Sequence, residues 1–101
     1  MFMTASNHDE ARRIADALVE EHLAACVQLL PQMQSVYRWQ GTIETQSEIL
    51  LIAKTTANSF DKLEKRVREL HSYDTPEVVA VPIVAGSDAY LKWLSANSSG
   101  N

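Results

Sequence analysis

The chain has 101 residues, with 13 acidic and 9 basic side chains and a formal net charge of −4 at pH 7. This length predicts one domain, residues 1–95, followed by a flexible tail at 96–101. The acidic balance argues against a nucleic-acid partner, and no apolar run reaches the ~20 residues of a membrane span.

The first half of the chain predicts a short strand at 1–5 and a helix at about 8–23. Asn7 and Glu10 have the spacing of a capping box, which marks a helix start. Residues 25–40 indicate a strand that Pro31 bends or confines to a sheet edge, because proline cannot donate a ladder hydrogen bond. A tight turn at Gly41-Thr42 leads into a second strand at 42–55.

The second half predicts a helix capped by Asn58 or Ser59, a turn, a strand at 77–85 and a short helix opened by residues 86–88. The resulting order is β-α-β-β-α-β with a C-terminal helix. This is the ferredoxin-like arrangement of the α+β class, in which both main helices cover one face of a four-stranded antiparallel sheet.

The two central strands are long for so small a domain. Sixteen residues at ~3.3 Å each span about 53 Å, whereas a compact chain of this size is roughly 35 Å across. The hairpin must therefore bend at Pro31 or extend beyond its own helices. Tyr37 and Trp39 share one face of the strand and are expected to be aromatic anchors for a partner.

Apolar side chains occupy both faces of the predicted strands. Leu50 and Ile52 point one way, and their neighbours in the run 49–53 point the other. A sheet with one open face would alternate apolar and polar residues, so we expect both faces to be covered. Self-association is the simplest cover, and the expected interface residues are Tyr37, Trp39, Leu50 and Ile52.

Few residues suggest chemistry. Cys26 is either a small buried residue or a soft metal ligand. His71, at the end of the second predicted helix, is either structural or part of a cleft with Tyr73 and Glu77.

Lys54 either extends to solvent or meets an acid at a site. Glu44, Gln46 and Glu48 share one strand face, which we interpret as solvated rather than as a cation site. No motif indicates an enzyme, and a single cysteine fits a reducing cytoplasm.

An ordered series of segments resembles the CutA family of divalent-cation tolerance proteins: "TAS", "LAACVQLLP", "SVYRWQGTIE", "SEILLIAKT", "ELHSYDTPEVVAVPI" and "YLKWL". The resemblance implies a ferredoxin-like homotrimer whose long hairpins wrap neighbouring subunits. It also implies a shape similar to PII-type signalling proteins, which bind small ligands between subunits, and a link to copper tolerance through divalent-ion binding.

The chain departs from the family at positions linked to metal. Ser72 and Asp74 stand where relatives commonly have proline and glutamate. Met3 stands where some bacterial members have cysteine, and Leu70 where they have a second histidine. The remaining candidate ligands are His71, Met3 as a thioether and, for monovalent copper, Cys26. We therefore expect weak copper binding.

These inferences predict a trimeric, non-enzymatic protein of divalent metal ion tolerance. One alternative is a PII-like sensor that binds an anionic metabolite in a cleft with Lys54, Tyr73 and Glu77. The other is a purely structural trimer without a specific ligand.

Overall fold

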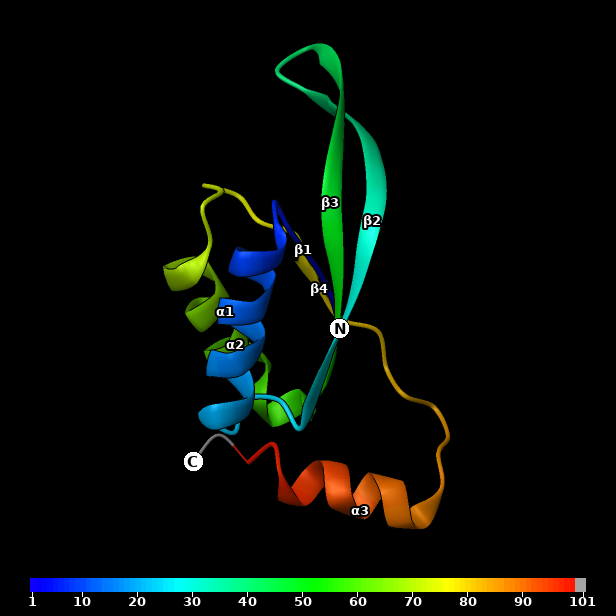
Figure 1. Cartoon of the computed structure of the whole chain (residues 1–101). Coiled ribbons are helices and arrows are strands. Elements are labelled where there is room, and N and C mark those ends of the chain that lie inside the picture. Colours follow the sequence, from blue (N-terminus) through cyan, green and yellow to red (C-terminus); the bar gives the residue numbers. More distant parts are fainter. Residues whose placement is uncertain (100–101) are drawn as a thin grey trace.

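The computed structural model describes residues 1–99. Its elements are β1 Phe2–Ala5, α1 His8–Glu20, β2 Cys26–Trp39, β3 Thr42–Lys54, the short 3₁₀ turn η1 Ala57–Ser59, α2 Phe60–Leu70, β4 Val78–Val79 and α3 Asp88–Ala96. The strands form one antiparallel sheet in the order β2-β3-β1-β4. Both α1 and α2 lie on the same side of it (Figure 1). This confirms the predicted ferredoxin-like α+β fold.

The hydrophobic core lies between the sheet and these two helices. It is made of Met3, Ala5, Leu51 and Ala53 from the strands and of Ala11, Ile14, Leu18, Leu63 and Val67 from the helices, with smaller contributions from Leu23 and Ala24. Since neighbouring strand residues point to opposite faces, Thr4, Leu50 and Ile52 lie on the face that α1 and α2 leave open.

Helix α1 begins with the predicted cap and ends three residues early. The Asn7 side chain accepts a hydrogen bond from the Glu10 N–H at 2.8 Å. At the other end His22 adopts a left-handed conformation with φ of 58°. The N–H groups of Leu23 and Ala24 then bond back to the carbonyl of Leu18, which closes the helix.

The hairpin of β2 and β3 is paired from Cys26 and Lys54 to Trp39 and Thr42. Its turn is Gln40-Gly41, one residue before the predicted position, and both residues have positive φ, as a type I′ hairpin turn requires. A register shift between Leu30 and Met33 includes Pro31, and β2 lies at the edge of the sheet, as the proline predicted. The hairpin extends beyond the helices (Figure 1), and the molecule measures 45 × 26 × 21 Å.

Strand β4 is much shorter than the predicted 77–85. Val79 pairs with Phe2, so the residues that follow pass the end of β1 and meet no strand of this chain within residues 1–99. Pro82 also lacks the N–H that a continuing ladder needs. The following segment runs to α3 without a sheet partner (Figure 1), and its Val81, Ile83 and Val84 side chains are exposed.

The C-terminal helix α3 lies across the lower end of the molecule (Figure 1), and Ser87 caps it by accepting from the Tyr90 N–H. Within the flexible tail predicted at 96–101, Ala96 is helical and Ser98 is buried. The carbonyl of Ser98 accepts hydrogen bonds from the hydroxyls of Ser59, at 2.6 Å, and Thr56. Residues 100–101 of the predicted tail lie outside the described residues.

Ser59 therefore does not cap α2 with its side chain, contrary to the prediction, since its hydroxyl is used by the C-terminal segment. Across residues 1–99, no helix has the length and apolar character that a membrane crossing needs.

Candidate ligand pocket

A cavity of about 600 Å³ lies where the hairpin meets the loop between α2 and β4. Its walls carry the aromatic side chains of Tyr37, Trp39 and Tyr73 and the carboxylates of Glu48, Asp74 and Glu77, with Thr4, Gln46 and Thr75 among its polar groups. The register places Tyr37, Trp39 and Glu48 on the face of the sheet that α1 and α2 leave open, because the three residues share the same alternation along the paired strands. The pocket is thus built mainly on that face, beneath the loop after α2.

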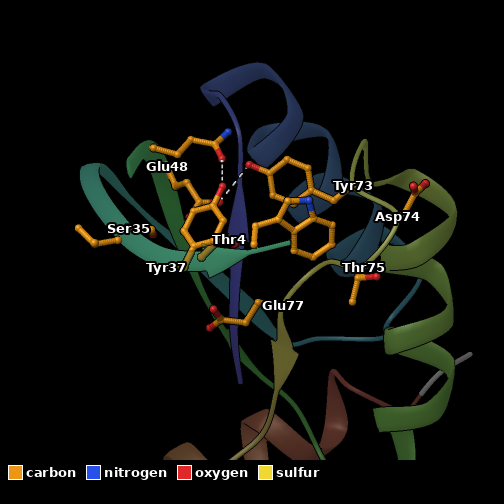
Figure 2. Close-up of a pocket in the computed structure, with 11 residues that line it drawn as sticks. Thr4, Ser35, Tyr37, Glu48, Tyr73, Asp74, Thr75 and Glu77 are labelled. Carbon is orange, nitrogen blue, oxygen red and sulfur yellow. Dashed lines mark hydrogen bonds between the residues drawn. The ribbon is translucent and has the colours of Figure 1, made fainter. Parts of the chain in front are cut away.

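Two tyrosine hydroxyls organise the pocket. The Tyr37 hydroxyl donates to Gln46 Oε1 at 2.8 Å, and the Tyr73 hydroxyl donates to Glu48 Oε2 at 3.1 Å. Figure 2 shows both hydroxyls turned toward each other beside Glu48. The hairpin and the loop after α2 are thereby joined across the cavity.

Burial and the neighbouring Glu48 carboxylate raise the pKa of Tyr73 to about 12. The phenol therefore stays protonated near neutral pH and keeps donating its hydrogen bond. Glu48 itself is only 7% exposed, although it comes from the outer half of the hairpin. The pocket thus holds a buried carboxylate whose hydrogen-bond donor is a neutral hydroxyl.

His71 fixes the loop that carries Tyr73. Its side chain is fully buried, its Nε2 donates to the carbonyl of Thr4 at 2.7 Å, and its Nδ1 accepts from the Tyr73 N–H at 3.0 Å. A ring that donates from one nitrogen and accepts at the other is a neutral imidazole protonated on Nε2. Both ring nitrogens are therefore in use, and the ring also packs 4.6 Å from that of Tyr73.

Glu10 ties the same loop to the start of α1. One carboxylate oxygen accepts from the N–H and hydroxyl of Ser6, and the other accepts from the Ser72 N–H at 2.8 Å. Burial alone would raise the pKa of Glu10, but these hydrogen bonds outweigh it and lower the pKa to about 2. The capping-box pattern identified Glu10 as a helix-start residue, but its partner Ser72 lies 62 positions away and gave no signal.

The structure does not bring the predicted metal ligands together. Met3 is 1% exposed and belongs to the hydrophobic core. Cys26 begins β2, where it pairs with Lys54 of β3, so β3 lies between Cys26 and the strand β1 that carries Met3. Both ring nitrogens of His71 already form hydrogen bonds. Within residues 1–99, no group of three His, Cys, Asp or Glu side chains could hold a metal ion.

Of the three residues predicted to share a ligand cleft, Tyr73 and Glu77 both line this cavity and Lys54 does not. Lys54 lies six residues beyond Glu48 along β3, and its amine donates to Gln28 Oε1 at 2.6 Å instead. The interpretation of Glu44, Gln46 and Glu48 as solvated is wrong for Glu48, which is buried, whereas Glu44 is exposed and Gln46 is half-buried at the wall of the cavity. Their shared face was visible in the sequence, but the loop that covers Glu48 was not.

The four predicted interface residues all lie on the open face. Tyr37 is 38% exposed and Trp39 is 50% exposed. Leu50 and Ile52 are partly covered. Large apolar side chains are also exposed at Val36 and Ile43 of the hairpin.

Similar proteins are found in bacteria and plants. The divalent-cation tolerance protein CutA of Thermus thermophilus is 49% identical over 98 residues, which are 97% of this chain and 95% of that protein. The chloroplastic CutA of Arabidopsis thaliana is 44% identical over 101 residues, all of this chain and 55% of that protein. The chain thus spans nearly the whole bacterial relative and about half of the plant one.

Solved structures agree with the fold. The structure of the divalent cation tolerance protein from Thermus thermophilus has a TM-score of 0.95, covering 96% of this chain and 94% of that one at 49% identity. CutA from Xylella fastidiosa has a TM-score of 0.90, covering 92% and 89% at 44% identity. The family described as CutA1 divalent ion tolerance protein matches residues 1–97. The chain therefore belongs to the CutA1 family.

Proposed function

We propose that this protein acts as a non-enzymatic homotrimer in tolerance of divalent cations, copper among them. The observation that supports the assembly is the uncovered apolar surface. Tyr37, Trp39, Leu50 and Ile52 share the open face of the sheet. A large apolar surface on a soluble chain marks an interface.

The segment after β4 supports the same assembly. Val81 is 58% exposed, Ile83 53% and Val84 92%, and this segment has no sheet partner within the described chain. Extended backbone with unpaired N–H and C=O groups is a template for strand addition. A neighbouring hairpin that overhangs its own helices, as this one does, has the shape to supply the missing partner.

We expect copper binding to be weak because both ring nitrogens of His71 already form hydrogen bonds within the chain. A metal ion can ligate this imidazole only after the ring gives up its bond to Thr4 or to the Tyr73 N–H. The thioether of Met3 would also have to leave the core. Cys26, which is half-buried at the start of β2, is a separate ligand for monovalent copper. The single free thiol suits a reducing compartment, and we place the protein in the cytoplasm.

Calorimetric titration with copper tests the proposed metal binding. Wild type should bind divalent copper weakly, and His71→Ala should lose that binding, whereas Cys26→Ala should retain it. The affinity should fall on acidification, because only neutral imidazole ligates and protons compete with the metal ion. If His71→Ala binds as well as wild type, His71 is not a ligand. In cells that lack this chain, growth in added copper should be impaired and restored by supplying it.

The second candidate function is a small-ligand sensor, which the cavity beside Glu48 favours. A ligand that binds only the folded state raises the melting temperature. A thermal-shift screen therefore separates a sensor from a purely structural trimer, which should respond to no small molecule.

A further inference from the structure

The C-terminal helix α3 is joined to the body of its own chain by one buried side chain. Among the described residues, Leu94 is the only buried member of the nine that form α3. Leu94 also lies outside the cluster that forms the hydrophobic core between the sheet, α1 and α2. Apolar packing within the chain therefore contributes far less to the position of α3 than to the positions of α1 and α2.

Hydrogen bonds hold the end of α3 instead. The carbonyl oxygen of Ser98 accepts from the Ser59 hydroxyl at 2.6 Å and from the Thr56 hydroxyl at 3.2 Å. A carbonyl oxygen has two lone pairs, so both are used. The Ser98 hydroxyl in turn donates to the carbonyl of Leu94 at 2.6 Å. Thr56, Ser59 and Ser98 are called the C-terminal clasp below.

The clasp is closed within a single chain. Ser98 is 0% exposed and Ser59 is 2% exposed, so the cover of both residues comes from this chain and does not require a neighbouring subunit. A buried carbonyl that loses its donors bears the desolvation cost of an unsatisfied acceptor. The two hydroxyls therefore decide how firmly the end of α3 is held.

The other end of α3 begins at a glycine. Residues 80–87 form no helix or strand (Figure 1), and Gly86 directly precedes the helix cap Ser87. A Cβ atom at Gly86 would lie 3.0 Å from Leu91 Cδ2, so the close approach of α3 requires glycine here. Glycine also has the most permissive backbone. Rotation at Gly86 would move α3 without changing residues 81–84, which the proposed assembly would pair with a neighbour.

Segments with few buried apolar contacts open at a lower free energy than the core of the same protein. We propose that α3 is a latch: residues 88–98 open as a unit about Gly86 while the sheet, α1 and α2 stay folded, and the C-terminal clasp sets how often they open. The open state exposes Leu94 and the hydroxyls of Thr56 and Ser59. This conformational device depends neither on copper nor on a ligand in the pocket.

Native-state hydrogen exchange on the full chain in its native assembly tests the latch. The N–H groups of Leu91 and Asn97 donate within α3 and report its opening, and the amides of α1 report the core. In wild type, the amides of α3 should be at least about tenfold less protected than those of α1. The double variant Thr56→Val/Ser59→Ala should accelerate exchange in α3 by about tenfold and leave α1 unchanged.

Three further variants make the test specific to the clasp. Thr56→Ser keeps the hydroxyl and should keep the wild-type protection of α3. Ser95→Ala, which removes an exposed hydroxyl from α3 itself, should not accelerate exchange. Thr56→Val alone changes a partly exposed residue, so it should fold even if the double variant does not, and it should accelerate α3 by a smaller factor.

The proposal is overturned if α3 of the wild type is protected as strongly as α1, since α3 would then open only with the whole fold or be held by a neighbouring subunit. It is equally overturned if the clasp variants leave exchange in α3 unchanged or accelerate α1 as much as α3. Acceleration by Ser95→Ala equal to that of Thr56→Val would also overturn it.

Discussion

The Nε2 atom of His71, just past the end of α2, donates a hydrogen bond to the carbonyl of Thr4 in β1 at 2.7 Å. Its Nδ1 accepts a hydrogen bond from the Tyr73 N–H at the same time. The ring therefore connects the sheet to the loop that forms one wall of the pocket. His71 acts in this structure as a positioning residue for Tyr73.

We expect His71→Ala to lower the free energy of unfolding by about 2–4 kcal/mol, because it empties a buried site and leaves the Thr4 carbonyl without its donor. Urea unfolding measures this change. His8→Ala, at an exposed position of α1, is the matched control and should change stability by less than about 0.5 kcal/mol. Equal stability of the two variants would show that the His71 contacts do not support the fold.

Glu10 should make the protein sensitive to acid. Its pKa is about 2 in the folded chain against an ordinary 4.5, so the unfolded chain takes up the proton first as pH falls. The stabilisation is fully present above about pH 4.5 and is lost as pH drops toward 2; its size is about 3 kcal/mol. Unfolding free energies of wild type and Glu10→Gln between pH 7 and pH 2 measure it.

The Glu10→Gln variant should be less stable at pH 7 and should have a flatter profile below pH 4.5. Glu20→Gln, an exposed change of the same kind, should keep the wild-type slope. A wild-type slope in Glu10→Gln would assign the acid sensitivity to other groups.

Tyr73 should be a late-titrating tyrosine. Burial and Glu48 raise its pKa from 10 to about 12, so the protonated phenol stabilises the fold up to about pH 10 and this contribution is lost between pH 10 and 12. An absorbance titration of the phenolate should show a step near pH 12 that Tyr73→Phe removes. Persistence of that step in Tyr73→Phe would contradict the assignment.

Trp39→Ala should weaken the assembly. Truncation of a large aromatic side chain buried at an interface costs about 3–5 kcal/mol, so the melting temperature should fall and become dependent on protein concentration. Val19→Ala is the control, since Val19 is also 43% exposed but lies on α1. A variant that melts like wild type at every concentration would show that Trp39 is an ordinary surface residue.

The sequence predicted the element order because apolar periodicity, the Asn7 cap and Pro31 are local signals. It predicted too long a β4. A strand ends where its partner strand ends, and the partner of β4 is β1, which lies far away in the sequence. The same reason explains the site. Tyr73 and Glu77 belong to the segment after α2 that the sequence singled out, and both line the pocket, whereas the burial of Glu48 depends on a loop 25 residues away.

Sedimentation equilibrium measures directly whether the chain assembles as a homotrimer. At micromolar concentration we expect a single species of about 34 kDa, three times the 11.3 kDa of one chain. A stable species of 11.3 kDa would mean that the apolar face remains exposed to water, and it would contradict the proposed homotrimer.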